Sequence, residues 1–154
     1  MAKKLAIIAS KGTLDGAYPP FLLASTAAAM GFEAKIFFTF YGLQLLKKEL
    51  SLKVSPLGNP AMPMPVPVPS LIQVLPGMEA FASWMMKRKL KSKGVASVEE
   101  LRNICLESGV KLIACQMTVD LFDFKHEDFI DGVSSGGAAT FLEFASDADT
   151  TLYI

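Results

Sequence analysis

Residues 5–40, LAIIASKGTLDGAYPPFLLASTAAAMGFEAKIFFTF, decide the fold class of this 154-residue chain. The stretch opens with a short apolar run at 5–9, which is typical of a strand buried on both faces of a parallel sheet. A loop at 11–16 leads into an alanine-rich helix, and a second apolar run follows at 34–40. Strand, helix and strand within about forty residues form a βαβ unit, which is normally parallel and right-handed. The sequence therefore predicts an α/β fold with a mainly parallel sheet.

The rest of the chain continues this alternation. Pro19 and Pro20 suit the first turn of the first helix, and Gly31 suits its end. Ser97 and Glu100 have capping-box spacing, which indicates the start of another helix. Further helices are expected at 43–50, at 78–90, after residue 115 with Thr118 or Asp120 as cap, at 126–131, and from 134 to 144. Two further strands are expected at 111–115 and 150–154.

Composition limits the classes to which the protein can belong. A chain of 154 residues with 51% hydrophobic residues fits one domain, 1–154, and is too apolar for a disordered protein. Residues 1–77 hold seven lysines and three acids (+4), and residues 78–154 hold eight basic and twelve acidic residues (−4). Neither balance predicts nucleic-acid binding. The mean hydropathy of +0.38 indicates apolar surface for subunit contacts or a membrane.

The two cysteines, Cys105 and Cys115, and the one histidine, His126, do not form a disulfide framework or have the spacing of a zinc site. No secretory signal precedes them, so a reducing, cytoplasmic location is expected. Neither the dinucleotide fingerprint nor the P-loop occurs, and we predict no metal or cofactor.

A proline- and methionine-rich apolar insertion occupies about 54–78. It has no charged residue, but its seven prolines forbid a regular membrane-spanning helix. A basic run, Lys87 to Lys93, follows Trp84-Met85-Met86. An apolar stretch joined to a cationic one makes 62–93 a candidate for peripheral membrane or partner contact, although packing in an oligomer interface explains the same pattern.

Cys115 is the main candidate for chemistry. It ends the predicted strand 111–115, and ligands bind at the carboxyl ends of strands in open α/β sheets. A following helix N-terminus favours a thiolate, which is a nucleophile. A buried structural cysteine fits the position equally well. Cys105 falls in mid-helix, where packing is the stronger explanation, and a redox pair with Cys115 requires that helix to fold over the strand end.

Two glycine-containing loops are expected at the same sheet edge. The first contains Gly12, Thr13 and Asp15, and the second contains Ser135 and Gly136. Glycines allow close approach of the backbone, and helix starts receive anions. Each loop alone is also explained as an ordinary turn. His126 lies in the charged run Lys125-His126-Glu127-Asp128, which is typical of a solvated surface.

Three segments resemble the DsrE/DsrF-like superfamily, and in particular its DsrE-like sulfur-carrier branch, also called "peroxiredoxin family protein". They are Gly-Thr-Leu-Asp-Gly-Ala-Tyr-Pro-Pro after the first strand, Phe-Phe-Thr-Phe-Tyr-Gly at 37–42, and Ala114-Cys115-Gln116-Met117. The insertion and the Ser-Ser-Gly-Gly-Ala-Ala-Thr stretch at 134–140 resemble that branch as well. The resemblance covers essentially the whole chain. The Thr-x-x-Cys pattern of true peroxiredoxins is absent, so peroxidase activity is not expected.

The resemblance implies a flavodoxin-like three-layer sandwich, a homo-oligomer, and sulfur donor and acceptor proteins as partners. It implies that Cys115 carries sulfane sulfur or thiosulfonate, with Gln116 beside it among the substrate-binding candidates. A sulfur carrier or sulfurtransferase-like protein is the leading hypothesis. The alternatives are a non-enzymatic module that binds a small anion or nucleotide at the same edge, and a subunit that docks on a membrane or a partner.

Overall fold

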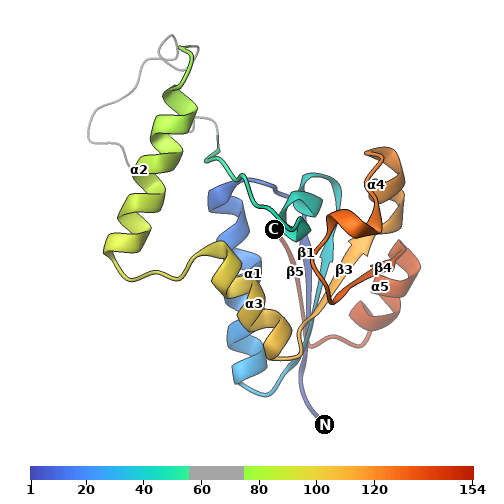
Figure 1. Cartoon of the computed structure of the whole chain (residues 1–154). Coiled ribbons are helices and arrows are strands. Elements are labelled where there is room, and N and C mark those ends of the chain that lie inside the picture. The colour runs from blue at the N-terminus through green and yellow to red at the C-terminus, as the bar shows by residue number, and fades with distance from the viewer. Residues whose placement is uncertain (56–74) are drawn as a thin grey trace.

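Five parallel strands form the sheet at the centre of the molecule (Figure 1). The computed structural model describes residues 1–55 and 75–154. The strands lie in the order β4-β3-β2-β1-β5, and all four pairings are parallel. Their bounds are β1 Lys4–Ala9, β2 Glu33–Phe38, β3 Lys111–Cys115, β4 Val133–Gly136 and β5 Thr150–Tyr153. The predicted α/β class is confirmed, and so are the four strands expected from the sequence.

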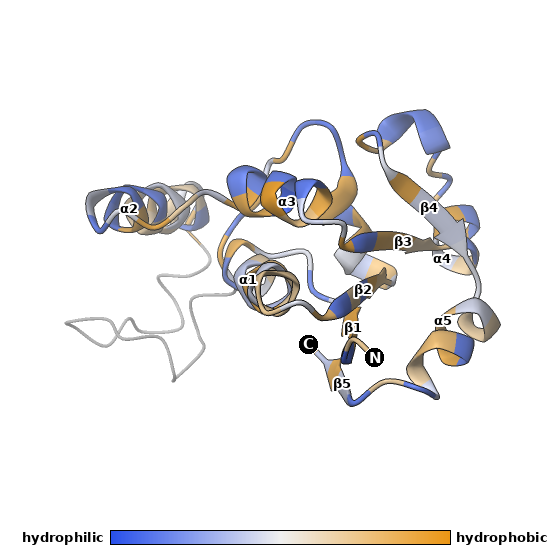
Figure 2. Ribbon diagram, turned by 90° about the horizontal axis from the view of Figure 1, so that it is seen from below, coloured by the Kyte–Doolittle hydropathy of each residue, from blue (hydrophilic) through white to orange (hydrophobic). Residues whose placement is uncertain are grey.

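Helices cover both faces of this sheet, which gives the predicted three-layer sandwich. Helices α1 (Leu14–Ala29) and α3 (Val98–Glu107) lie side by side on one face, whereas α5 (Ala138–Ala145) lies on the other (Figure 2). The larger core fills the space below α1 and α3, with Phe21, Phe38 and Leu112 fully buried in it. The smaller core lies below α5. Its buried members are Ala6, Phe37, Ile113, Cys115, Phe141 and Phe144.

Helix α1 begins earlier than predicted. Its N-cap is Thr13, whose Oγ1 accepts a hydrogen bond from the Gly16 N–H at 3.2 Å. Pro19 and Pro20 therefore stand inside the helix and not in its first turn. The side-chain cap fixes the start, because it satisfies an amide that the helix itself leaves unpaired.

The segment 134–137 was predicted to open a helix, and this prediction is wrong. Val133–Gly136 is strand β4, which pairs with β3, and the helix begins only at Ala138. The sequence VSSG has no apolar run, so pairing with β3 selects the extended conformation here. The helix after β3, α4 (Gln116–Leu121), also differs from expectation, because its N-cap is Cys115 and neither Thr118 nor Asp120.

The helix expected at 43–50 is instead a 3₁₀ helix, η1, spanning Phe40–Leu46. Arg102 of α3 is 4% exposed and its Nη1 donates to the carbonyl oxygens of Leu45 and Lys47, both at 2.8 Å. A carbonyl at the end of a helix needs such an outside donor. The long-range contact with Arg102 thus holds the end of η1.

The remaining helices agree with the sequence. Helix α2 (Met78–Ser92) projects away from the sheet (Figure 1), and the capping box of Ser97 and Glu100 is present at the start of α3. A short 3₁₀ helix, η3, spans His126–Asp128. Most of the insertion expected at 54–78 lies outside the described residues, as does the 62–74 part of the expected contact region.

Candidate functional site

Cys115 is the last residue of β3 and the N-cap of α4, so it lies at the carboxyl edge of the sheet as predicted. Its neighbour across the sheet is Gly136, the last residue of β4. Strands β3 and β4 run side by side, and both end at this point. The backbone at residue 115 is therefore bordered by the start of α4, which follows β3, and by the start of α5, which follows β4.

The connections that leave β3 and β4 turn to opposite faces of the sheet. Val119 of α4 and Phe129 belong to the core below α1 and α3, whereas Phe141 of α5 belongs to the core on the other face. A crevice forms outside the carboxyl ends of two parallel strands where the chain direction divides in this way, and it is the usual ligand position in open α/β sheets. Cys115 stands at the carboxyl end of β3, where the connections that follow β3 and β4 leave for opposite faces.

The side chain of Cys115 points to the α5 face and is 5% exposed. It packs in one cluster with Phe37, Ile113 and Phe141, and Phe37 stacks on Phe141 with ring centroids 5.1 Å apart. This cover over Cys115 was not predicted from the sequence. The spacing of Phe141 and Phe144 on one helix face was the available signal, but only the tertiary structure shows which strand they cover.

The structure brings Gln116, Ser135 and Gly136 next to Cys115 along the backbone. Gln116 is exposed and its Nε2 donates to Asp120 Oδ1 at 2.8 Å. Ser135 pairs with Ala114, and alternation along β4 puts its side chain on the same face as Val133, opposite to that of Cys115. Gly136 and the α5 N-cap, Gly137, are thus the β4 residues nearest to the Cys115 face.

Gly12, Thr13 and Asp15 are at the same sheet edge but follow β1, two strands from β3. Neighbouring strands lie about 4.8 Å apart, so roughly 10 Å separates the two strand ends. Gly12 is required because a Cβ there would collide with the carbonyl oxygen of Tyr41. Its close backbone contact is therefore with η1, and Thr13 is occupied in capping α1.

Asp15 holds the chain just before the insertion. Its Oδ1 accepts from the Ser55 N–H at 2.8 Å, and its Oδ2 accepts from Ser55 Oγ at 2.6 Å. Burial alone raises the pKa of Asp15, but hydrogen bonds from Ser55, from its own amide and from Thr13 outweigh burial and hold that pKa below its usual 3.8. The carboxylate thus has a structural partner.

We expect Asp15→Asn to remove an acid-dependent part of the stability. Because the folded-state pKa lies below the unfolded one, this stability is present above the unfolded pKa and disappears as pH falls through the folded pKa. Wild type should therefore unfold at higher temperature than Asp15→Asn at neutral pH, and the gap should narrow as the pH falls below about 4. Thermal unfolding followed by circular dichroism over this range measures the gap. A gap that stays constant with pH would contradict the assignment.

Cys105 is not a redox partner for Cys115. It is fully buried in the core below α1 and α3, and its Sγ lies 3.3 Å from the carbonyl oxygen of Phe21. The sheet separates it from Cys115, which faces α5. Burial raises the pKa of Cys105 to about 11, so this thiol stays protonated at neutral pH.

His126 is exposed, as the charged run around it predicted. Its ring packs edge-on against Phe129, with centroids 6.5 Å apart. Phe129 belongs to the core opposite Cys115, so nothing in this packing brings the imidazole to the thiol. Within residues 1–55 and 75–154, no group of three or more His, Cys, Asp or Glu side chains is arranged to hold a metal ion.

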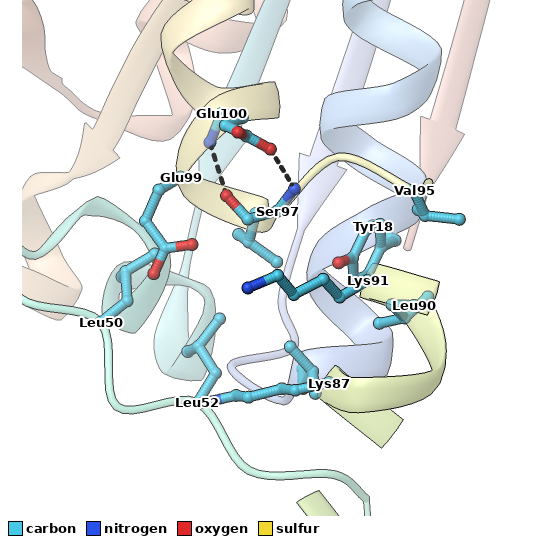
Figure 3. A pocket seen from close by; sticks show the side chains of 12 residues that line it. Tyr18, Leu50, Leu52, Lys87, Leu90, Lys91, Val95, Ser97, Glu99 and Glu100 are labelled. Carbon is cyan, nitrogen blue, oxygen red and sulfur yellow. Dashed lines mark hydrogen bonds between the residues drawn. The ribbon is translucent and has the colours of Figure 1, made fainter. Parts of the chain in front are cut away.

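Two of the hollows in the described part of the chain are relevant to the predicted site residues, and both lie away from Cys115. One, of about 340 Å³, is lined by Gly12 and Thr13, by Lys47 and Lys53, and by Glu49 and Glu79. The other, of about 400 Å³, lies between α2 and the start of α3, with Leu14 and Leu52 in its wall and Lys91 extending into it (Figure 3). Neither is lined by Cys115 or by the end of β4, so the glycine loop after β1 and the cysteine belong to separate places.

Comparison with known proteins agrees with the fold. The chain matches the DsrE/DsrF/DrsH-like family over residues 1–153. It is 64% identical over 156 residues to the sulfur carrier protein DsrE2 of Allochromatium vinosum, covering 99% of this chain and 98% of that protein. It is also 29% identical to the uncharacterised protein YrkE of Bacillus subtilis, over 99% and 97% of the two chains.

Two solved structures share the fold at low sequence identity. The ychN protein of E. coli superimposes with a TM-score of 0.56 at 14% identity, with 99% of both chains covered. Protein MTH1491 of Methanobacterium thermoautotrophicum, of unknown function, gives a TM-score of 0.51 at 9% identity, covering 97% of this chain and 98% of that one. The family match and the DsrE2 relative both span nearly the full length. The chain therefore belongs to the DsrE/DsrF/DrsH-like family.

Proposed function

We propose that this protein is a sulfur carrier that holds sulfane sulfur on Cys115 and passes it to a partner thiol. The observation that carries the proposal is the place of Cys115 at the carboxyl end of β3, where the connections after β3 and β4 leave for opposite faces of the sheet. The relative named as a sulfur carrier, at 64% identity over nearly the whole length, supports the same chemistry.

The transfer needs no cofactor and no net oxidation. The Cys115 thiolate attacks the terminal sulfur of a persulfide or thiosulfate donor. A new S–S bond forms at Sγ, the S–S bond of the donor breaks, and the thiolate or sulfite leaves with the electron pair. An acceptor thiolate then attacks the outer sulfur of the Cys115 persulfide and releases the Cys115 thiolate. The donor and acceptor are proteins or small molecules that present sulfur in this form.

Backbone N–H groups at the same edge support the anionic sulfur. Cys115 is the N-cap of α4, and Gly137 is the N-cap of α5. Glycine has no side chain, so none caps the first amides of α5 from this position. The first amides of a helix have no partner within the helix and favour negative charge. Gln116 and Gly136 complete the proposed substrate position, with Ser135 on the adjoining backbone.

Intact-mass spectrometry tests the proposal directly. The protein is incubated with thiosulfate, with tetrathionate, or with neither, and is then analysed before and after a reductant. We expect a mass gain that the reductant reverses and that peptide mapping assigns to Cys115. If no donor adds mass, Cys115 is structural under these conditions. In that case a binding module becomes the better hypothesis, with Gly12 and Thr13 in the wall of the hollow that Lys47 and Lys53 also line. Asp15 lies in the same loop, and Glu49 and Glu79 make the wall of this hollow mixed in charge.

Self-association is part of the proposal. Helix α1 exposes Leu22 and Leu23, its C-cap Met30 is exposed as well, and the edge strand β5 exposes Tyr153. Apolar side chains at a sheet edge and on a covering helix are typical of contacts between subunits. We propose a homo-oligomer, and light scattering after size-exclusion chromatography measures its mass.

Helix α2 gives a specific reason to propose membrane contact as a second property. Phe81, Trp84, Met85 and Arg88 share one helix face, on the side away from the buried Ser83. Phe81 stacks on Trp84 with centroids 6.0 Å apart, and Arg88 lies 5.4 Å from the Trp84 ring. Exposed aromatic rings beside lysines are typical of helices that lie on anionic lipid. Within the described part of the chain no helix is long and apolar enough to cross a membrane.

Vesicle binding checks this property. Trp84 is the one tryptophan of the sequence, so its fluorescence reports on α2 alone. We expect a blue shift and co-sedimentation with vesicles that contain phosphatidylglycerol, and loss of both at high salt, because salt screens surface charge. Pure phosphatidylcholine vesicles are the control. Absence of sedimentation with anionic vesicles removes the hypothesis, and a cytoplasmic location is proposed in either case.

A further inference from the structure

Cys115 is almost fully covered by its own protein, although a transferred sulfur needs space. At 5% exposure, its side chain lies in a small core with Phe37, Ile113 and Phe141. A nucleophile must approach the outer sulfur in line with the S–S bond, so both the donor and the acceptor have to reach this side chain. The described conformation therefore protects the thiol and does not present it.

Helix α5, which covers Cys115, makes different contacts at its two ends. At its carboxyl end, Phe144 lies 4.1 Å below the Lys35 ammonium, Lys4 Nζ lies 3.7 Å from Asp147, and the Lys4 N–H donates to Asp149 at 2.7 Å. These contacts attach the carboxyl end of α5 to strands β1 and β2, which contain Lys4 and Lys35.

The amino-terminal end of α5, next to Cys115, has a different attachment. It is joined to β4 through Gly136 and Gly137. A Cβ at Gly136 would touch Ile113 Cγ2 at 3.0 Å, so this residue is packed against β3, whereas a Cβ at Gly137 would meet nothing within 4 Å. Gly137 thus combines the backbone freedom of glycine with open space around it. Under this end of α5, the Phe141 ring stacks on the Phe37 ring.

We propose that α5 is a movable cover of Cys115, which pivots on its carboxyl end and opens at Gly137, with Phe141 as the side chain that controls access. The inference rests on the proposed function, because it explains how the covered thiol exchanges sulfur with partners. An eight-residue helix with two buried aromatic anchors opens at lower free energy than the long helices on the opposite face. Local opening exposes Cys115 while the larger core stays closed.

Thiol labelling tests the cover without using sulfur chemistry. Purified protein is treated with iodoacetamide at several urea concentrations below the unfolding transition, and peptide mass spectrometry follows Cys115 and Cys105 separately. We expect Cys115 to be labelled faster than Cys105, with a urea dependence that is measurable but smaller than that of global unfolding. A Cys115 rate independent of urea, or one with the full dependence of global unfolding, would overturn the proposal.

Variants of the helix sharpen the test. Phe141→Ala should raise the Cys115 labelling rate by about tenfold or more, because it removes a buried anchor. Leu142→Ala, on the exposed side of the same helix, is the matched control and should leave the rate unchanged. Gly137→Ala should lower the rate about two- to fivefold, because it restricts the backbone at the end of α5 that opens, without a collision. Equal rates in all four proteins would also overturn the proposal.

The two proposals fail in different ways. Sulfur loading that maps to Cys115 together with urea-independent labelling would keep the carrier function and reject the cover. Locally gated labelling without any sulfur adduct would keep the cover and reject the carrier function.

Discussion

Replacing Cys115 by serine is expected to abolish sulfane-sulfur loading while leaving the fold intact. The attacking atom in the proposed transfer is the Cys115 thiolate, and a serine hydroxyl at the same place neither ionises near neutral pH nor forms an S–S bond. Serine is close to cysteine in size, so the packing against Phe37 and Phe141 changes little. Intact-mass spectrometry after thiosulfate or tetrathionate should show the reductant-sensitive adduct on wild type and none on Cys115→Ser.

The matched control is the other cysteine. Cys105→Ser should keep full loading, since Cys105 is buried on the opposite side of the sheet with its pKa raised to about 11. Far-ultraviolet circular dichroism and the urea midpoint confirm that both variants are folded. An adduct that persists on Cys115→Ser, or one that disappears from Cys105→Ser while that variant is folded, would show that the sulfur is not carried on Cys115.

Replacing Arg102 by methionine is expected to cause the largest loss of stability among single changes outside the apolar core. Arg102 donates to two carbonyl oxygens, those of Leu45 and Lys47, in a buried position between α3 and η1. Methionine fills much of the same volume but donates to neither oxygen. Each buried acceptor that loses its partner costs about 1–3 kcal/mol, so we expect a total loss of about 2–4 kcal/mol in the free energy of unfolding.

A second effect works in the opposite direction and limits the size of this loss. Burial lowers the pKa of Arg102, although the charge of Glu99 acts against that shift, so the folded state pays a desolvation cost for the cation. Its Nε is also without a hydrogen-bond partner in the described residues. Methionine removes both costs, which is why we expect less than the sum of two fully lost acceptors.

Urea denaturation measures this prediction. Asn103→Ala, on the exposed side of the same helix, should change the free energy of unfolding by no more than about 0.5 kcal/mol. Arg102→Lys keeps a charge and one donor group, and it should fall between wild type and Arg102→Met. If Arg102→Met unfolds at the same urea concentration as wild type, the hydrogen bonds at the end of η1 do not contribute to stability.

The strands that could be predicted are those whose own sequence carries the signal. Runs such as 5–9 and 112–115 are apolar throughout, as strands buried on both faces must be, and the structure has strands at Lys4–Ala9 and Lys111–Cys115. Strand β4 was missed for the complementary reason. It reads VSSG and exists because β3 offers it a partner, and such pairing leaves no periodicity in the sequence.

Some features of the candidate site could likewise be predicted from local sequence, whereas others depend on the order of the strands. The place of Cys115 at a strand end follows from local sequence. The resemblance to the DsrE/DsrF-like superfamily also rests on short local motifs, and the family match confirms that the chain belongs to this family. The Gly12 loop lies at the same sheet edge as Cys115, as predicted, but the strand order inserts β2 between β3 and β1, so roughly 10 Å separates the two strand ends. Strand order is set by long-range pairing and by the handedness of crossovers, which a strand's own residues do not encode.

The sequence by itself thus determined the α/β class, the family and the cysteine at the strand end, because apolar runs, caps and short motifs act over a few residues. Only the tertiary structure decided on which face each thiol lies, that α5 covers Cys115, and that Thr13 and Asp15 hold α1 and Ser55. These features depend on which distant segments share a core. A one-residue shift of register in β3 would exchange the faces of its side chains, so packing of the whole sheet, and not the local run, puts Cys115 beneath Phe141.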